Sequence, residues 1–377
     1  MSDIFRDLAQ PGRALALGAR CRRFESYSPD QNKDRHCRWS FFVFGFMVEL
    51  NKENIIKLLS DEENQSELFV RADCIRKEYV GDEVHLRGLI EFSNICRNNC
   101  MYCGLRRGNI SLKRYHMTAE ELVNVAKCAA NMGFKTIVLQ SGEDMYYGKD
   151  RLSSIIEKIK KFDVAVTLSV GERDYDEYKA WREAGADRYL MRIETTDKNL
   201  YHKLNPQMSW QHRYECLLML KELGYELGSG IMVGLPEQDI SSIAEDLLFL
   251  KDLDVDMSGI GPFIPHPDTP LAGEKGGSLD LALRTMAVQR LLMKDINIPA
   301  TTAMETLHPQ GRIMALQCGA NVIMPNVTDN EYRKLYELYP GKENADNNLY
   351  YYQSSVGTKI TAIGRIVGSG YGGRVKK

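Results

Sequence analysis

The chain has 377 residues, of which 44% are hydrophobic and 27% charged, and its formal net charge is −2. This composition is typical of a globular protein and excludes a fibrous repeat or wholesale disorder. A nearly neutral chain is not attracted to polyanions, and no apolar run approaches the roughly 20 residues that span a bilayer. We therefore expect no nucleic-acid partner and no membrane partner, but a small-molecule substrate. Nine cysteines without a disulfide pattern indicate a reducing, cytoplasmic location.

Residues 1–46 differ in character from the rest of the chain, because their arginines are scattered among Pro, Gly and Ser without apolar periodicity. Three interpretations remain: a disordered tail, a start site assigned too early with Met47 as the true first residue, or a transit peptide. Interspersed acidic residues weaken the third. Residues 47–87 are expected to form a helical segment, with a helix over 52–59, that packs on the outside or the bottom of the domain that follows.

Short β-rich runs alternate with helical patterns over residues 88–345, which is typical of parallel βα units. Thr118 with Glu121 predicts a capping box, Ser209 a helix cap, and Gly185 and Gly224 two helix ends. Eight repeats predict the α/β class and a (β/α)8 TIM-type barrel, whose active site lies at the carboxyl ends of the strands. Residues 346–377 are expected to be a C-terminal tail. The predicted strands are 89–93, 136–140, 164–169, 188–194, 227–233, 257–263, 300–304 and 321–325.

Three cysteines, Cys96, Cys100 and Cys103, fall within eight residues directly after the first predicted strand. Each intervening residue spans only about 3.3–3.6 Å, so the three thiolates can wrap one compact metal centre. A [4Fe–4S] cluster usually takes four thiolates, and three would leave one iron open to an external ligand. The alternative is a zinc site, but zinc normally needs four ligands and only His116 is near. The scattered cysteines are expected to be small apolar fillers: Cys21, Cys37, Cys74, Cys128, Cys216 and Cys318.

The spacing CX3CX2C, with Tyr102 before the last cysteine, resembles the signature of the radical S-adenosylmethionine superfamily. The resemblance implies a [4Fe–4S] cluster whose open iron binds the amino and carboxylate groups of S-adenosylmethionine. One electron from the reduced cluster then breaks a C–S bond and releases methionine and a 5′-deoxyadenosyl radical.

Residues at the ends of successive predicted strands can complete the cosubstrate pocket. Gln140-Ser-Gly-Glu143 resembles the Gly-Gly-Glu motif of the superfamily, which contacts the ammonium group. Arg213 is suited to a carboxylate, because its planar guanidinium binds one through two hydrogen bonds. Taken singly, these acids and this arginine can equally be ordinary surface ion pairs. The full set of expected cosubstrate contacts is Tyr102, Gln140, Gly142, Glu143, Ser169, Glu194, Arg213 and Met232.

Within the superfamily, the chain resembles the HydE family of maturases, which help to build the organometallic cofactor of [FeFe]-hydrogenase. The stretches that carry this resemblance are 79–85, 90–94, 103–107, 137–144, 261–271, 299–304 and 321–326. The resemblance implies radical attack at the sulfur of a small cysteine-bound organometallic iron substrate. It also implies companion hydrogenase maturases and an electron donor such as ferredoxin or flavodoxin. The candidate substrate contacts are Thr167, Arg192, Thr301, Thr302, Met257, Met324 and Tyr336, with core packing as the alternative for Met257.

The sequence departs from the family pattern in two places. Ile193 stands where members often have histidine, in Arg192-Ile-Glu-Thr195, so one polar contact beside the substrate is lost. Some members carry three further cysteines near the C-terminus, whereas residues 350–377 contain none, which predicts one cluster only. Two alternatives remain: a radical enzyme of the biotin-synthase or methylornithine-synthase type, and an iron–sulfur redox sensor without turnover.

Overall fold

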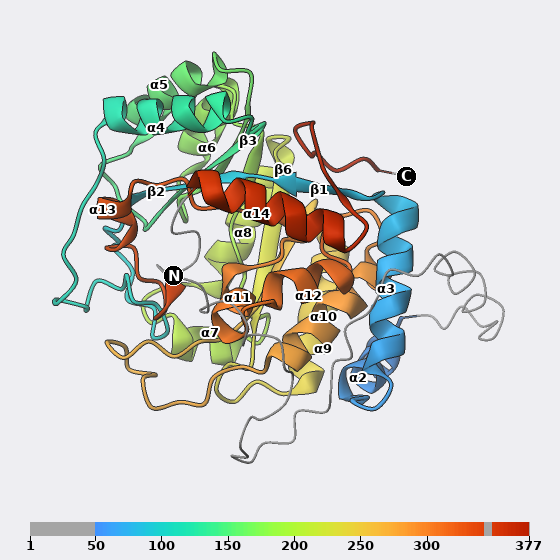
Figure 1. Ribbon diagram of the computed structural model, residues 1–377. Coiled ribbons are helices and arrows are strands. Elements are labelled where there is room, and N and C mark those ends of the chain that lie inside the picture. Colours follow the sequence, from blue (N-terminus) through green and yellow to red (C-terminus); the bar gives the residue numbers. More distant parts are fainter. Residues whose placement is uncertain (1–49, 343–348, 377) are drawn as a thin grey trace, which may run out of the picture.

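The structure, a computed structural model, describes residues 50–342 and 349–376, so the expectations for residues 1–46 and Met47 fall outside it. Six parallel strands form the central sheet, in chain order from edge to edge (Figure 1). Nearly all residues of these strands are buried, as expected for parallel strands covered on both faces. The strands are β2 (Gly88–Ser93), β3 (Thr136–Ser141), β4 (Ala165–Ser169), β5 (Arg188–Leu190), β6 (Glu226–Val233) and β7 (Met257–Pro262).

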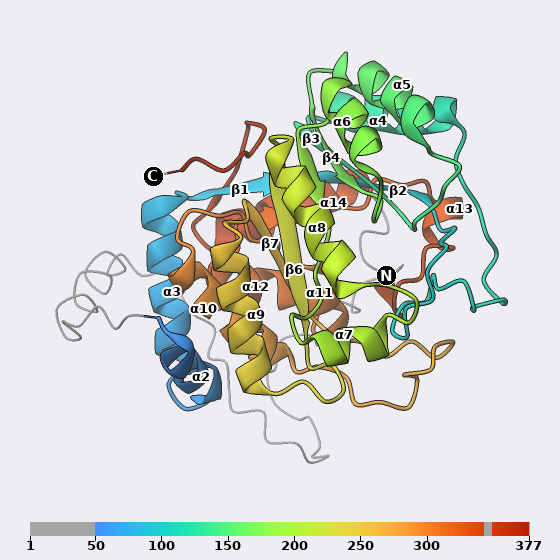
Figure 2. The same cartoon turned by 180° about the vertical axis from the view of Figure 1, so that it is seen from behind.

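Helices follow the strands and cover the outside of the sheet (Figures 1 and 2). The predicted capping box of Thr118 and Glu121 is confirmed, and so is Ser209 as a helix cap. Gly185 and Gly224 have the positive φ angles expected after helix ends, 108° and 75°. Among the described residues, no helix is long and apolar enough to cross a bilayer. The covering helices are α4 (Ala119–Asn131), α5 (Lys149–Lys160), α6 (Tyr175–Glu183), α8 (Trp210–Glu222), α9 (Ile240–Asp252) and α10 (Leu279–Leu292).

Three of the predicted strands differ from the observed structure. The fourth, over 188–194, ends already at Leu190, and the last two differ more. Instead of a strand over 300–304, helix α11 (Thr302–Leu307) begins after Thr301, because Ala, Met, Glu and Leu outweigh the β-branched threonines. Only two residues of the eighth predicted strand form β8 (Val322–Ile323). The regular sheet therefore has six strands and does not close on itself. Isolated parallel bridges link its two edges: Met257 to Asn297, Pro299 to Val322, and Asn326 to Leu89.

The N-terminal segment packs on the outside of the sheet's helical layer. Its two helices, α2 (Lys52–Ser60) and α3 (Gln65–Tyr79), contact α9 and α10, in agreement with the predicted helical segment. The sequence did not predict strand β1 (Glu83–Leu86), which pairs with β8 and with β9 (Ile366–Val367) in a second, three-stranded sheet. Short helices complete the order: α7 (Lys198–Leu204), α12 (Gly311–Gln317) and α13 (Asn330–Arg333).

The C-terminal segment covers the amino ends of the strands. After α14 (Leu349–Ala362) and β9, the carbonyl oxygen of Tyr371 accepts hydrogen bonds from Thr136 and Arg188, at the starts of β3 and β5. The carbonyl oxygen of Gly372 accepts a hydrogen bond from Arg87, just before β2. The tail is thus built into the end of the sheet that lies away from the cysteine loop.

Arg374 anchors this segment through three carboxylates. Its guanidinium lies 2.7 Å from Asp254, 2.8 Å from Asp295 and 3.4 Å from Asp256, and its side chain is only 9% exposed. We expect Arg374→Ala to lower the free energy of unfolding by about 2–3 kcal/mol, because it removes the largely buried cation that three clustered acids share. Lys376→Ala is the matched control, since Lys376 pairs with the same Asp254 but is 62% exposed. It should cost less than about 1 kcal/mol. Urea unfolding of both variants measures this, and equal losses would contradict it.

Candidate active site

The three cysteines of the motif lie on a loop that begins where β2 ends. Backbone hydrogen bonds fix this loop from three sides: Arg97 donates to Glu143 after β3, Met101 to Leu204 of α7, and Gly104 to Leu338 after α13. The loop therefore lies at the carboxyl end of the sheet, where the βα pattern placed the site.

All three motif cysteines are free and partly buried. Burial raises the pKa of the Cys100 thiol to about 12, and it also raises the pKa values of Cys96 and Cys103. Within residues 50–342 and 349–376, just one trio of metal-ligating side chains has its donor atoms all within 4.8 Å of one another, and it contains none of these cysteines. In this structure, the three sulfurs are therefore not gathered within 4.8 Å of one another around a single small ion.

His116, the fourth zinc ligand in the alternative reading, is engaged elsewhere. Its ring stacks on Tyr146 with centroids 4.0 Å apart, and its Nδ1 lies 3.6 Å from the Asp144 carboxylate. The zinc interpretation therefore lacks its fourth ligand in this structure.

Gly142 allows the cysteine loop to approach the end of β3. A Cβ atom at this position would lie 2.3 Å from the carbonyl oxygen of Ile95 and 2.8 Å from Cβ of Cys96. Real Cβ atoms do not come this close to backbone atoms, so a side chain here would displace the loop. Gly142 is thus required for packing beside Cys96.

We expect Gly142→Ala to lower the free energy of unfolding by about 1–3 kcal/mol, the range for overpacking a close contact. It should also lower the iron content after reconstitution, because Cys96 would have to move. Gly148→Ala is a suitable control, because its nearest neighbour is 3.9 Å away and its φ of −74° suits alanine. Iron analysis and urea unfolding test this. An alanine variant at position 142 with normal iron content would refute the packing argument.

Glu143 joins the cysteine loop to the strand that follows. Its carboxylate lies 2.9 Å from Nε of Arg97 and accepts a hydrogen bond from the backbone N–H of Glu172 at 3.0 Å. The left-handed Gly171, with φ of 78°, makes room for it, because a Cβ there would lie 2.0 Å from Cγ of Glu143. Glu143 thus contacts Arg97 of the cysteine loop and the backbone of Glu172, two partners that the sequence did not reveal.

Gln140 and Ser169 lie side by side at the ends of β3 and β4, where they are directly paired in the ladder. Gln140 donates a hydrogen bond to the hydroxyl of Tyr336 at 3.3 Å. Tyr336 belongs to a buried group with Leu105 and Tyr115 that packs against Cys103. Predicted cosubstrate and substrate residues therefore meet beside the cysteine loop.

Glu194 has an unusual backbone for a non-glycine residue, with φ of 68°. Such conformations persist only where the surroundings enforce them, and they often occur at functional sites. Burial raises the pKa of its carboxyl group, while Arg192, at 3.2 Å, opposes the rise. The strained turn after β5 thus places a buried acid beside β6, where the N–H of Met232 donates a hydrogen bond to the carbonyl oxygen of Glu194.

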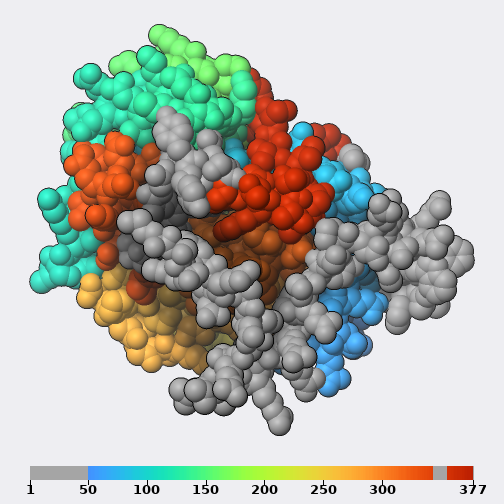
Figure 3. Space-filling model, viewed as in Figure 1, coloured from blue at the N-terminus to red at the C-terminus, as the bar shows by residue number. Residues whose placement is uncertain are grey.

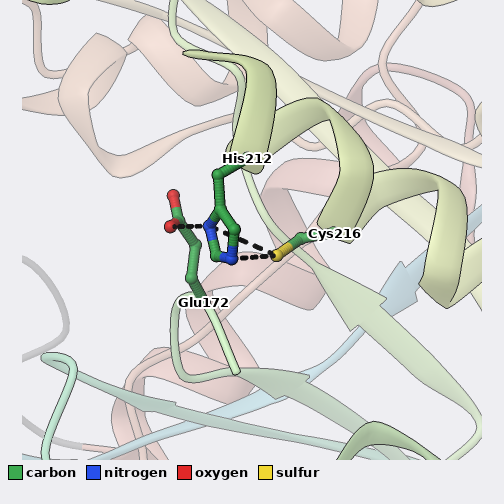
Figure 4. A group of neighbouring side chains, drawn as sticks. All are labelled: Glu172, His212 and Cys216. Atoms are coloured by element: carbon green, nitrogen blue, oxygen red, sulfur yellow. Dashed lines mark hydrogen bonds and ion pairs between the residues drawn. The ribbon is translucent and has the colours of Figure 1, made fainter. Parts of the chain in front are cut away.

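Arg213 is held by a network that the sequence did not predict. Its Nε lies 2.8 Å from the Glu172 carboxylate, and the other oxygen of Glu172 is 2.7 Å from Nδ1 of His212 (Figure 4). His212 and Cys216 lie one turn apart on α8, and these two with Glu172 are the trio whose donor atoms lie within 4.8 Å. Since Glu172 is only 7% exposed and already binds Arg213, we interpret the trio as the support that orients this arginine.

An apolar group lies on the other side of the cysteine loop. Tyr102 packs against Met232, Leu200 and Phe263, and its hydroxyl donates to Asn205 at 2.9 Å. This group brings the aromatic ring of Tyr102 together with the apolar cluster that contains the thioether of Met232. Phe263 and Leu200 were missed, because nothing in their sequence context distinguishes them from core residues.

The predicted substrate residues do not all lie together. Thr167 is buried on β4, and its hydroxyl has no hydrogen-bond partner within the described residues. Thr301 follows the isolated bridge at Pro299, and its Oγ1 would be 3.1 Å from a Cβ on Gly261. Met324 directly follows β8 and is half-buried.

Three other predicted contacts are already engaged or lie elsewhere. Arg192 donates to the carbonyl of Ile231, and Thr302 accepts a hydrogen bond from Arg312 at 3.0 Å. Met257 begins β7, where its sulfur is 2.7 Å from Arg87, and so lies at the opposite end of the strands from the cysteines. Its burial favours the core-packing alternative over a contact with the substrate.

Comparison with known proteins agrees with this geometry. The model of the Radical SAM superfamily matches residues 90–250. The chain is 56% identical over 329 residues to the [FeFe] hydrogenase maturase subunit HydE of Thermotoga maritima, covering 87% of this chain and 94% of that protein. It is 32% identical to 3-methylornithine synthase of Methanosarcina acetivorans, over 74% of this chain and 80% of that one.

A solved structure of methylornithine synthase (PylB) superposes with a TM-score of 0.74 at 27% identity, covering 89% of this chain and 97% of that one. The fold is thus shared with this methylornithine synthase along most of its length. Identity is nevertheless much higher to the maturase than to the synthase, 56% against 32%. The chain therefore belongs to the radical S-adenosylmethionine superfamily and, within it, to the HydE family of [FeFe]-hydrogenase maturases.

Proposed function

We propose that this HydE-family enzyme holds one [4Fe–4S] cluster on Cys96, Cys100 and Cys103 and binds S-adenosylmethionine beside it. The observation that carries the proposal is the convergence of three free, partly buried thiols with acidic and basic side chains from successive strand ends. When bound, the cluster supplies the electron that cleaves the cosubstrate to methionine and a 5′-deoxyadenosyl radical.

The residues around the cysteines have distinct proposed tasks. Arg213, oriented by Glu172 and His212, binds the carboxylate of the cosubstrate, and Glu143 attracts its ammonium group. Glu194 and Ser169 accept or donate hydrogen bonds to the ribose. Tyr102 and Met232 pack against the adenosyl group and exclude water. Gln140 ties this pocket to Tyr336, so that the cosubstrate and the substrate lie next to each other.

The proposed substrate is a small cysteine-bound organometallic iron complex. Thr167 supports this choice, because its buried hydroxyl has no hydrogen-bond partner in the described part of the chain and is free to bind a ligand atom. Arg192, Thr301, Thr302, Met324 and Tyr336 are the further proposed contacts. Ile193 is fully buried, so its replacement of a polar residue changes the core beside Arg192 rather than an exposed surface.

We also propose that the strands and the bridges between them form a (β/α)8 barrel and that residues 88–345 are one catalytic unit. Residues 47–87 would pack on the outside of this unit. Residues 346–377 would form the C-terminal tail, at the amino end of the strands. The isolated bridges between the sheet edges support the barrel. Companion maturases and an electron donor such as ferredoxin or flavodoxin are the proposed partners.

The test is maturation of a hydrogenase. The gene is expressed anaerobically with the companion maturases and an apo-hydrogenase in a host that lacks its own HydE. Hydrogen evolution well above the level without this gene is expected. Lack of activity, from a protein that still forms 5′-deoxyadenosine, would instead favour a carbon-rearranging enzyme of the methylornithine-synthase type, to which the chain is 32% identical.

A further inference from the structure

The segment that carries the cysteines is strongly basic, although the whole chain is nearly neutral. No Asp or Glu occurs between Glu91 and Glu120, whereas five basic side chains do. Glu91 is fully buried and pairs with Lys342, so it adds no negative charge to the surface. The basic residues of this segment are Arg97, Arg106, Arg107, Lys113 and Arg114.

The basic side chains are attached directly to the cysteine loop. The backbone N–H of Arg107 donates to the carbonyl of Asn98 at 2.8 Å. The side-chain oxygen of Asn99 accepts hydrogen bonds from Arg106 at 2.9 Å and from the N–H of Gly108 at 3.0 Å. Asn98 and Asn99 lie between Cys96 and Cys100 in sequence. The outer loop, residues 104–114, therefore lies immediately outside the cluster ligands.

This outer loop presents positive charge and one apolar side chain to solvent. Arg107 and Lys113 are exposed, and Ile110 is 96% exposed. Within residues 50–342 and 349–376, neither Arg107 nor Lys113 forms an ion pair with a carboxylate. Figure 1 shows the connection from β2 to α4 running outward on the side of α13, and Figure 3 shows its surface (teal) at the edge of the same face. An exposed apolar residue amid unpaired cations is typical of a docking surface.

We propose that residues 104–114 form the docking surface for an acidic one-electron carrier protein, the class that reduces the cluster. The inference rests on the proposed function, because only a cluster that must be reduced in each turnover requires such a partner. Opposite charge guides the carrier to this face, and Ile110 is the apolar contact at its centre. In the transfer, the carrier loses one electron and the cluster gains one, and no bond is made or broken.

The position of the outer loop, next to the cysteines, suits the docking of an electron carrier. Electron transfer slows steeply with distance, so a carrier must dock close to the cluster. Elsewhere the cysteine loop is held by α7 and by the segment after α13, which accept hydrogen bonds from the N–H groups of Met101 and Gly104. In the outer loop, by contrast, Arg107 and Lys113 reach solvent without a carboxylate partner among the described residues.

The test compares wild type with the double variant Arg107→Glu/Lys113→Glu, both carrying the cluster. A reduced acidic flavodoxin is the probe. The dissociation constant of the flavodoxin complex is measured by titration at low and at moderate salt. It should be about tenfold higher or more in the variant than in the wild type. Only the wild-type constant should depend strongly on ionic strength. Cleavage of S-adenosylmethionine driven by flavodoxin should slow by a similar factor. Cleavage driven by dithionite should not change, because this small reductant needs no docking surface.

Lys57→Glu is the matched control, since this exposed lysine lies on α2, away from the loop (Figures 1 and 2). It should leave the flavodoxin constant unchanged. Ile110→Ser should weaken binding without altering its salt dependence. Unchanged flavodoxin binding in the double variant would overturn the proposal, and so would loss of the dithionite-driven reaction, which would indicate a structural role of the loop. If the wild type itself fails with dithionite, the proposed function fails first, and the docking surface falls with it.

Discussion

Cys100→Ala is expected to lower the formation of 5′-deoxyadenosine by about a thousandfold or more, the order seen when one member of a unit that acts as a whole is removed. Cys100 is the middle one of the three proposed cluster ligands, and its Sγ lies 3.8 Å from Sδ of Met208 in a partly buried position. Two remaining thiolates cannot hold a cluster that normally needs at least three. Iron and sulfide content after anaerobic reconstitution and chromatography of the nucleoside products measure the effect.

Cys128→Ala provides the control for this prediction. Cys128 is exposed on α4, so its loss should leave the iron content and the reaction rate unchanged. The comparison separates ligand loss from a general effect of removing a thiol. A Cys100→Ala protein with the iron content and rate of the wild type would refute the ligand assignment.

Arg213→Ala is expected to weaken S-adenosylmethionine binding by about thirtyfold to several thousandfold, corresponding to the 2–5 kcal/mol lost when one partner of a buried charge pair is truncated. The change removes the proposed carboxylate contact and also leaves Glu172, 7% exposed, without its arginine. Both effects oppose an anionic carboxylate in the pocket. Equilibrium binding of S-adenosylmethionine to the cluster-loaded protein gives the dissociation constant.

Two further variants distinguish contact from orientation. Glu172→Gln retains Arg213 but removes its ion pair, so it should weaken binding less than Arg213→Ala does. Arg182→Ala is the control, because Arg182 is a partly buried arginine of α6. Among the described residues, the only hydrogen bond of its side chain goes to the backbone carbonyl of Ala186. This variant should leave the binding of S-adenosylmethionine unchanged. An Arg213→Ala protein that binds within threefold of the wild type would exclude Arg213 from the pocket.

The sequence predicted the parts of the fold in which local pattern and tertiary packing agree. Strands β2, β3, β4, β6 and β7 were placed within one residue at each end, because long buried runs between capped helices leave little ambiguity. It failed at residues 300–304, where two threonines suggested a strand but the following helix formers prevailed. It also missed β1, whose four residues pair with β8 and β9, more than two hundred residues away in the chain.

For the candidate site too, some residues could be predicted from the sequence and others could not. The cysteines and the residues at strand ends could be named because spacing along the chain fixes them on one face. Arg97, Glu172 and His212 could not, because their importance comes from partners that are 40 or 46 residues away: Glu143 for Arg97, and His212 for Glu172. Such pairs have no signal in one sequence without the fold. Met257 shows the converse error, since strand register placed it at the amino end of β7.

The formation of 5′-deoxyadenosine by the purified protein tests the central claim most directly. The protein is reconstituted anaerobically with iron and sulfide, reduced with dithionite, and incubated with S-adenosylmethionine. The account predicts 5′-deoxyadenosine and methionine in equal amounts, dependent on Cys96, Cys100 and Cys103. A protein that contains a full, reducible cluster but produces no 5′-deoxyadenosine would contradict it and would leave an iron–sulfur redox sensor as the better explanation.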